Sequence, residues 1–239
     1  MIVRMRFTKL GKVRWTSHRD VARMWERALR RAGLPVAYTG GFSPRPQLSF
    51  GLALPTGCES VAEYLDVTLE TEVEPEVVAK TLGSLLPAGI VVVAADEPEP
   101  GCGSLQEDVT SCTWEISVPG TTRSELDDAL SRVMAAASLP VRRERKGRAV
   151  SDDLRPSLLV LYAADTHDAH AAHDAPGTKL VAELGTRPRG VRPAELAQVV
   201  GIELGLATRT CQWIERGGSK FEPLDVRAAV AAAAVERAS

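Results

Sequence analysis

The 239-residue sequence has no apolar run long enough to cross a membrane as a helix. Its most apolar run, Gly89–Ala95, has only the length of a strand. The first residues, Met1–Lys12, interleave charged and apolar side chains, so they lack the continuous apolar core of an export signal. We therefore expect a cytoplasmic protein with no membrane partner.

The sequence also lacks the cysteine spacings of zinc and iron–sulfur sites. Its four cysteines are widely separated, and no two stand two or three residues apart. In a cytoplasmic protein such cysteines are isolated reduced thiols, and we expect no cofactor. The four are Cys58, Cys102, Cys112 and Cys211.

Several catalytic motifs are missing as well. The sequence contains no G-x-S-x-G, no Walker loop, no G-x-G-x-x-G and no H-E-x-x-H. A metal-independent RNA-cleaving site needs none of these, because one base and a basic clamp suffice. The formal net charge of −2 excludes a uniformly basic coat for nucleic acid, but it leaves room for one basic face.

The first half of the chain alternates between two hydrophobic periodicities. Apolar residues at every second position predict half-buried strands, and apolar residues three or four apart predict helices. Ser17 is a suitable N-cap, with Asp20 three residues later, and Gly33 is a suitable helix end. The predicted elements are a strand at Ile2–Thr8, a helix from Ser17 to Gly33, extended segments at Val36–Tyr38 and Val61–Glu70, a helix at Pro75–Leu86 and a strand at Ile90–Ala95.

The second half repeats this order without obvious sequence identity. We predict an α+β fold with two tandem ferredoxin-like (βαββαβ) units, antiparallel sheets and helices on one face. The domains are residues 1–100, residues 109–225 and an Ala-rich C-terminal helix at 226–239, with a turn-rich segment between the halves. The predicted elements are strands at Thr113–Val118, Val141–Arg148, Pro156–Ala163, Lys179–Gly185 and Thr208–Glu215, and helices at Thr122–Ser138 and Pro193–Leu204.

The start of the first helix is a candidate anion site. Backbone N–H groups at a helix N-terminus attract anions, and His18 and Arg19 stand in its first turn beside Ser17. An arginine there opposes the helix dipole, which favours a functional reason for it. The alternative is that Ser17 only caps the helix, His18 is solvated and Arg19 pairs with an acidic neighbour.

A second candidate is the stretch YTGGFSPRPQLSFG at residues 38–51. Its glycines, Gly40 and Gly41, permit positive φ angles, and two prolines restrict the backbone around Ser43 and Arg45. An arginine held in this way suits a phosphate or a carboxylate. The two phenylalanines, Phe42 and Phe50, are expected to anchor the loop in the core rather than to stack on a base.

The second half contributes further candidates. A basic hairpin at residues 142–148 and a loop framed by proline and glycine add Arg155, Arg189 and Arg192 to the candidate anion-binding residues. Such charge runs are also typical of solvated faces. Three histidines in a polar loop suggest a metal site only weakly, because nothing around them orients ligands. They are His167, His170 and His173.

The first quarter of the chain resembles the radical-SAM-linked family of unknown function. The resemblance rests on F-T-K-L-G, S-H-R-D, G-F-S-P-R-P, L-P-x-G and E-Y-L-D between Phe7 and Asp66. The second half matches more loosely, at Leu154–Pro156, Arg192–Pro193 and Thr208–Thr210. Members of that family stand alone or follow a radical SAM enzyme domain. This chain has no C-x-x-x-C-x-x-C motif, so the resemblance implies the separate partner form.

These observations lead to one main expectation and two alternatives. The main one is a non-catalytic accessory protein that binds RNA or another phosphate-bearing substrate and works with a separately encoded radical SAM enzyme, with no DNA partner. The first alternative is a metal-independent RNA-processing endonuclease with His18 as its base. The second is a pure protein-interaction domain for the radical SAM partner.

Overall fold

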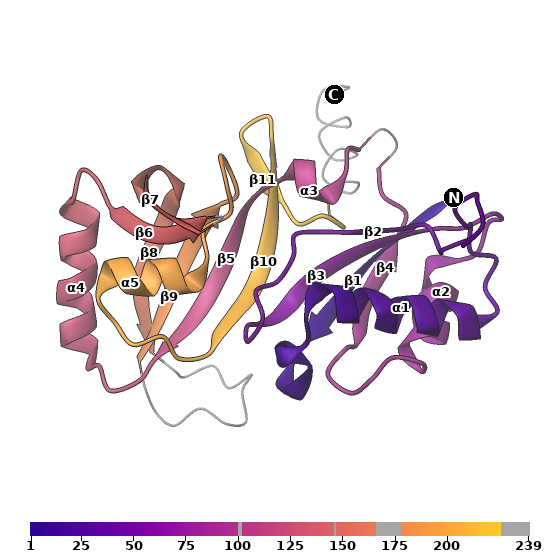
Figure 1. The fold of residues 1–239 in the computed structure, drawn as a ribbon, viewed down its shortest axis with the longest axis horizontal. Coiled ribbons are helices and arrows are strands. Elements are labelled where there is room, and N and C mark those ends of the chain that lie inside the picture. Colours follow the sequence, from indigo (N-terminus) through magenta and orange to yellow (C-terminus); the bar gives the residue numbers. More distant parts are fainter. Residues whose placement is uncertain (100–101, 146, 166–177, 226–239) are drawn as a thin grey trace, which may run out of the picture. The chain divides into compact units, whose positions relative to one another are not determined.

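The computed structural model describes residues 1–99, 102–145, 147–165 and 178–225 (Figure 1). Within them the protein is a mixed α+β protein with mostly antiparallel strands and five α-helices. The chain divides into a first unit, Met1–Thr110 with the chain from Cys211 onward, and a second unit, Ser111–Thr210. It passes between them within β5 (Val109–Val118) and β10 (Ala207–Arg216). The domain boundaries expected from sequence stay predictions.

The strands of the first unit follow the order β4-β1-β3-β2. The central strand β1 pairs antiparallel with β3 and β4, and β2 pairs antiparallel with β3. The elements of this unit are β1 (Ile2–Lys9), a 3-10 helix η1 (Gly11–Trp15), α1 (His18–Ala32), β2 (Leu48–Phe50), β3 (Glu59–Thr68), α2 (Pro75–Gly83), β4 (Val92–Asp96), α3 (Leu105–Asp108) and β11 (Ser219–Phe221), which pairs with β10.

The period-two pattern of β1 divides its side chains between two faces. Val3, Met5 and Phe7 are buried in the core beneath α1 and α2. Trp25 of α1 meets the ring of Phe7 edge-on, with the centroids 4.9 Å apart. Aromatic pairs favour this geometry, so α1 is held against the sheet by an oriented contact as well as by burial of apolar area.

The opposite face of β1 carries arginines, and these are paired. The Arg4 guanidinium is buried and donates to both carboxylate oxygens of Asp66 on β3, at 2.8 and 2.9 Å. Its remaining nitrogen donates to the backbone carbonyl of Pro223 at 3.3 Å. Arg6 donates to Glu222 at 2.7 Å. A buried cation needs such partners, so Arg4 has a structural role, and Arg6 is a half-buried cation with a carboxylate partner.

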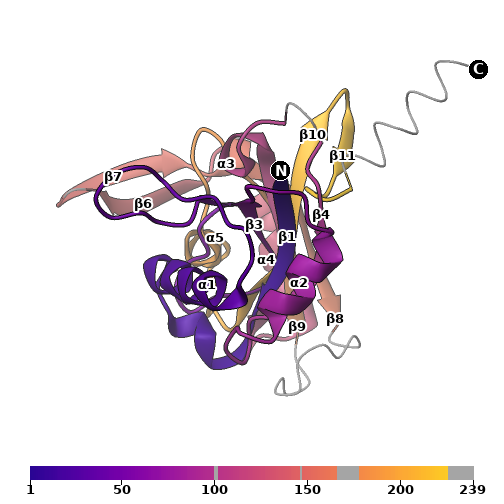
Figure 2. The same cartoon turned by 90° about the vertical axis from the view of Figure 1, so that its right-hand side faces the viewer.

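The second unit has the strand order β10-β5-β9-β8, with β5–β9 and β9–β8 antiparallel. A hairpin between α4 and β8 forms a two-stranded sheet of its own (Figure 2). The elements of this unit are α4 (Arg123–Ala135), β6 (Pro140–Arg145), β7 (Arg148–Asp153), a 3-10 helix η2 (Arg155–Ser157), β8 (Leu158–Asp165), β9 (Thr178–Gly185) and α5 (Pro193–Val200).

One extended segment expected from sequence is not a strand. Residues 36–38 make only two isolated bridges, Val36 to Leu69 and Tyr38 to Pro46. The edge strand β2 begins only at Leu48. Prolines lack the N–H that a ladder requires, and they stand on both sides of this segment, which explains the delay. The Ala-rich tail at 226–239 lies outside the described residues.

Replacement of Asp66 by asparagine is expected to lower the free energy of unfolding by about 3–5 kcal/mol, because it leaves the Arg4 charge buried without its carboxylate. Urea denaturation measures this change. Asp127→Asn is the matched control, since its pair with Arg123 is on the surface of α4 and is worth at most about 1 kcal/mol. Equal losses in the two variants would contradict a buried role for the Arg4–Asp66 pair.

Candidate functional site

The N-terminus of α1 is capped by Ser17, as the sequence predicts. The Ser17 hydroxyl accepts a hydrogen bond from the Asp20 amide at 3.2 Å and donates to the Asp20 carboxylate at 2.7 Å. Arg23 approaches the same carboxylate at 3.3 Å. These hydrogen bonds, first that from Ser17, lower the pKa of Asp20 below its ordinary value. The hydroxyl of Ser17 is therefore occupied by the cap itself.

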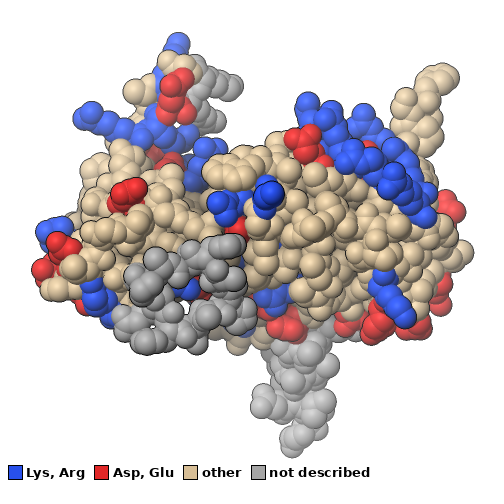
Figure 3. Space-filling view, turned by 90° about the horizontal axis from the view of Figure 1, so that it is seen from below, with Lys and Arg blue, Asp and Glu red and all other residues tan. Residues whose placement is uncertain are grey.

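Beyond this cap, α1 presents one broad face of arginines. Arg19, Arg23, Arg27 and Arg31 are four residues apart, and Arg30 falls between them on the helix surface. All five side chains are exposed, whereas the opposite face of the helix is buried in the core. Figure 3 shows Lys and Arg side chains gathered into a dense strip over this helix. We call these five residues the arginine face.

Few acidic side chains neutralise the arginine face. Arg23 pairs with Asp20, and Arg30 approaches Glu26 at 3.8 Å, both at exposed positions. Such exposed pairs contribute little to stability. For Arg19, Arg27 and Arg31 the described residues offer no ion-pair partner. The alternative that Arg19 pairs with an acidic neighbour is therefore not realised within the described chain.

Sequence reasoning singled out Arg19 but missed the other members of the face. The signal was present, because arginines at i, i+4, i+8 and i+12 of a predicted helix must share one side. The prediction of this helix used only its apolar positions, because they define its packing.

Within the stretch at residues 38–51, residues 39–45 form a closed loop and Leu48–Phe50 form β2. The Thr39 amide donates to the Arg45 carbonyl at 2.9 Å, and the Arg45 amide donates to the Thr39 hydroxyl at 3.1 Å. Gly41 has a φ of 109°, which a side chain would strain. The residues enclosed by these bonds, Gly40, Ser43 and Arg45 among them, are exposed. No acceptor for the Arg45 guanidinium lies among the described residues.

The two phenylalanines of this stretch have different environments. Phe42, at the tip of the loop, is 110% exposed, so the expectation that it anchors the loop in the core is wrong. Phe50 is half-buried and packs against the core of the first unit. The His18 ring lies edge-on to Phe50, with centroids 5.2 Å apart. This contact brings the start of α1 next to the strand that follows the loop.

A further exposed aromatic side chain lies just before α1. Trp15 is 64% exposed and packs one ring edge against Gly57. The Arg14 guanidinium stands over the ring at 5.3 Å from its centroid, within reach of a cation–π interaction. With Phe42 and Tyr38, which is 40% exposed, Trp15 gives the first unit three large aromatic side chains open to solvent.

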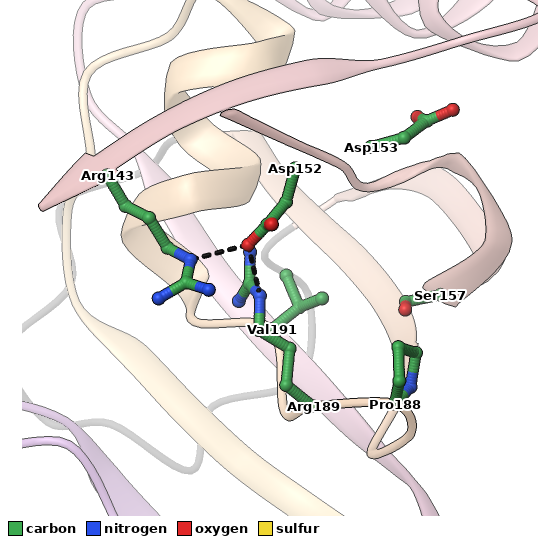
Figure 4. A pocket seen from close by; sticks show the side chains of 7 residues that line it. All are labelled: Arg143, Asp152, Asp153, Ser157, Pro188, Arg189 and Val191. Carbon is green, nitrogen blue, oxygen red and sulfur yellow. Dashed lines mark hydrogen bonds and ion pairs between the residues drawn. The ribbon is translucent and has the colours of Figure 1, made fainter. Parts of the chain in front are cut away.

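In the second unit, carboxylates accept hydrogen bonds from the side chain or the backbone amide of each predicted anion-binding arginine. Arg189 donates to Asp152 at 2.8 Å and to Glu195 at 2.9 Å (Figure 4). The Arg192 amide donates to Glu195, and the Arg155 amide donates to Asp153. Arg189 is thus the centre of an ion-pair network, a role that sequence spacing did not reveal because Asp152 is 37 residues away.

The weak prediction of a metal site is not tested by the structure, because His167, His170 and His173 lie outside the described residues. Within the described chain, no group of three or more His, Cys, Asp or Glu side chains is placed to hold a metal ion. In that part of the chain no helix is both long and apolar enough to span a membrane.

The Asp20 carboxyl is expected to titrate below its ordinary pKa, and Ser17→Ala should move it back toward that value. Because the folded pKa is the lower one, the stabilising contribution of Asp20 is present above the unfolded pKa and is lost as the pH falls through the folded pKa. Carboxyl NMR titration measures this shift. Glu125, whose carboxylate accepts hydrogen bonds from the amide and hydroxyl of the α4 N-cap Thr122, is the internal control and should not respond. An unchanged Asp20 titration in Ser17→Ala would contradict the assigned cause.

The chain was compared with known proteins. Residues 3–186 match the family described as "Uncharacterized protein conserved in bacteria (DUF2344)". That description states no reaction, ligand or partner. A search of curated proteins finds no match to the chain. The match covers the first unit from Val3 to Thr110 and the second from Ser111 to Thr186, and the chain belongs to the DUF2344 family.

Proposed function

We propose that the protein is a non-catalytic accessory protein whose first unit binds RNA, or another phosphate-bearing substrate, through the arginine face of α1 and the loop at residues 39–45. The observation that carries this proposal is the arginine face itself. Five exposed arginines stand on one side of a single helix in a chain whose formal net charge is −2. Charge concentrated in this way on an otherwise balanced protein is typical of a polyanion-binding surface.

The energetics of the helix support a functional reason for this face. Like charges four residues apart destabilise an isolated helix by a few tenths of a kcal/mol per pair, and alternating signs would remove that cost. Arginine forks match phosphate oxygens and remain charged at any physiological pH. From Arg19 to Arg31 the helix rises about 18 Å, a length that spans several phosphates of a nucleic-acid strand.

The loop adds features that favour an unpaired strand over a duplex. Phe42 offers a fully exposed ring, and Arg45 an exposed guanidinium on a backbone held by Thr39. Aromatic rings stack on unpaired bases, which single-stranded RNA presents and a duplex hides. The contact of His18 with Phe50 supports a common surface for the loop and the start of α1.

We further propose that the protein works with a separately encoded radical SAM enzyme, and the resemblance to the radical-SAM-linked family supports this. The protein presents its substrate to a separately encoded radical SAM enzyme in the cytoplasm and has no cofactor of its own. The strand orders β4-β1-β3-β2 and β10-β5-β9-β8 support two tandem ferredoxin-like units, in which the hairpin β6–β7 is an insertion. Fold alone does not imply function, so the surface carries the argument.

The triple variant R19Q/R23Q/R27Q is expected to bind single-stranded RNA more weakly and to reduce the slope of log K against log salt by about 2, since each lost phosphate contact removes about 0.7. Fluorescence anisotropy at several salt concentrations measures both quantities. R132Q is the control for loss of one exposed arginine outside the face, on α4 of the second unit, and should leave both quantities unchanged.

Three measurements distinguish the proposal from the alternative functions. An unchanged salt slope in the triple variant would exclude the arginine face as the RNA site. DNA of the same sequence should bind more weakly than RNA, and equal binding would leave a general polyanion surface. Co-purification with a radical SAM enzyme that survives all three substitutions, without RNA binding by the wild type, would establish a pure protein-interaction domain instead.

Phe42→Ala is expected to weaken RNA binding by about 5- to 100-fold, the loss of one base-stacking contact, with an unchanged salt slope. Because the ring is fully exposed, the free energy of unfolding should not change. Phe42→Tyr retains the ring and should bind as the wild type does. Wild-type affinity in Phe42→Ala would remove the loop from the proposed surface.

A metal-independent endonuclease is the second candidate function. The observation in its favour is His18, exposed beside Arg19 and held by its ring contact with Phe50. A histidine of this kind is a suitable general base, and a neighbouring arginine stabilises developing charge. RNA cleavage in the presence of a chelator that disappears in His18→Ala would establish this activity, and RNA that stays intact supports the accessory role.

A further inference from the structure

The second unit contains a polar pocket of about 500 Å³ where the hairpin β6–β7 meets the loop before α5 (Figure 4). This volume is in the range of small-molecule sites, which extends from about 300 to 1,000 Å³. The pocket lies within one unit and is separate from the arginine face. Its lining residues are Arg143, Asp152, Asp153, Ser157, Pro188, Arg189 and Val191.

Two guanidinium groups are held side by side at this pocket by one carboxylate. The Nε atoms of Arg143 and Arg189 both donate to the Oδ2 atom of Asp152. Arg189 is fixed further by bonds from Nη1 to Glu195 at 2.9 Å and to the Gly190 carbonyl at 3.1 Å. Without the shared carboxylate, two like charges at this separation would repel each other.

The shared carboxylate remains ionised at neutral pH. Hydrogen bonds from Arg143, and then from Arg189, lower the pKa of Asp152 below its ordinary value. The carboxylate is therefore available to pair with both guanidiniums at physiological pH. Arginines fixed before binding lose less side-chain entropy when a ligand arrives.

The outer nitrogens of the two guanidiniums are left over by this network. Arg143 uses only Nε, and Arg189 uses Nε and Nη1. In the described chain no acceptor is found for Nη1 and Nη2 of Arg143 or for Nη2 of Arg189. The ion pairs of the described residues do not use these three NH₂ groups. Their number matches an anion with three terminal oxygens.

The rest of the lining indicates the kind of molecule that carries the anion. Val191 is buried and, with the ring of Pro188, supplies apolar surface. The buried Ser157 hydroxyl makes only a long hydrogen bond, 3.5 Å, to the Arg187 carbonyl. Asp153 also lines the pocket, and its Oδ1 atom accepts hydrogen bonds from the Leu139 and Arg155 amides. Polar side chains therefore dominate the lining, and Pro188 and Val191 are its apolar part.

From this arrangement we infer that the pocket binds the phosphate group of a small molecule, held by the outer nitrogens of Arg143 and Arg189, with the non-phosphate part of the molecule against Pro188 and Val191. This site goes beyond the proposed RNA-binding function, because it uses neither the arginine face nor the loop at residues 39–45. A carboxylate has only two oxygens for three NH₂ donors and is the poorer match.

Calorimetric titration of the full-length protein with inorganic phosphate tests the site. The wild type should show saturable binding, and R143Q and R189Q should each weaken it by about 10- to 100-fold, the loss of a charge-assisted hydrogen bond. R142Q is the matched control. It removes the same charge from the neighbouring position of β6, yet Arg142 does not line this pocket, and phosphate affinity should be unchanged.

Each other result overturns the inference. If the wild type shows no saturable phosphate binding, the inference is wrong. It is also wrong if R142Q loses as much phosphate affinity as R143Q, because that result would show only general charge attraction. Citrate that binds more tightly than phosphate would reassign the pocket to carboxylates. If thermal unfolding shows R189Q to be misfolded, R143Q decides alone. RNA binding should be unaffected by R143Q, so failure here is distinguishable from failure of the proposed function.

Discussion

The contact between Phe7 and Trp25 determines how the first unit presents its charge. It places the apolar side of α1 on β1, and because a helix turns by 100° per residue, the arginines must then face solvent. The same seating brings His18 at the start of the helix to the ring of Phe50. Together with Val21, Ala28 and Leu29 of α1 in the same core, this contact orients the helix face and places its N-terminus beside the strand that follows the exposed loop.

Arginine has two opposite uses in the first unit. On β1, the buried Arg4 and the half-buried Arg6 are each paired with a carboxylate, and for Arg4 burial requires this. On α1, five arginines remain in solvent with few acidic neighbours. The overall charge of −2 hides this division, because a sum over the chain does not distinguish a neutralised cation from one available to a ligand.

The second unit uses its cations differently again. Arg143 and Arg189 share Asp152, so their positions are fixed while their outer nitrogens stay open to a pocket. An extended surface of exposed arginines suits a long anion that is recognised by charge, whereas two guanidiniums paired with one carboxylate suit a small anion that is recognised by geometry. The two surfaces call for different ligands and are tested by different substitutions.

Local patterns in the sequence were enough to predict α1, its cap at Ser17, the strand β1 and the constrained loop around Arg45, because hydrophobic period, capping and proline geometry act over a few residues. The spacing of the arginines on α1 is also a local pattern, although no prediction was based on it. The exposure of Phe42, the return of the chain to the first unit at Cys211 and the sharing of Asp152 by two arginines depend on residues far apart in sequence. Only packing in three dimensions establishes which side chains are covered and which charges meet, so these features had to come from the folded chain.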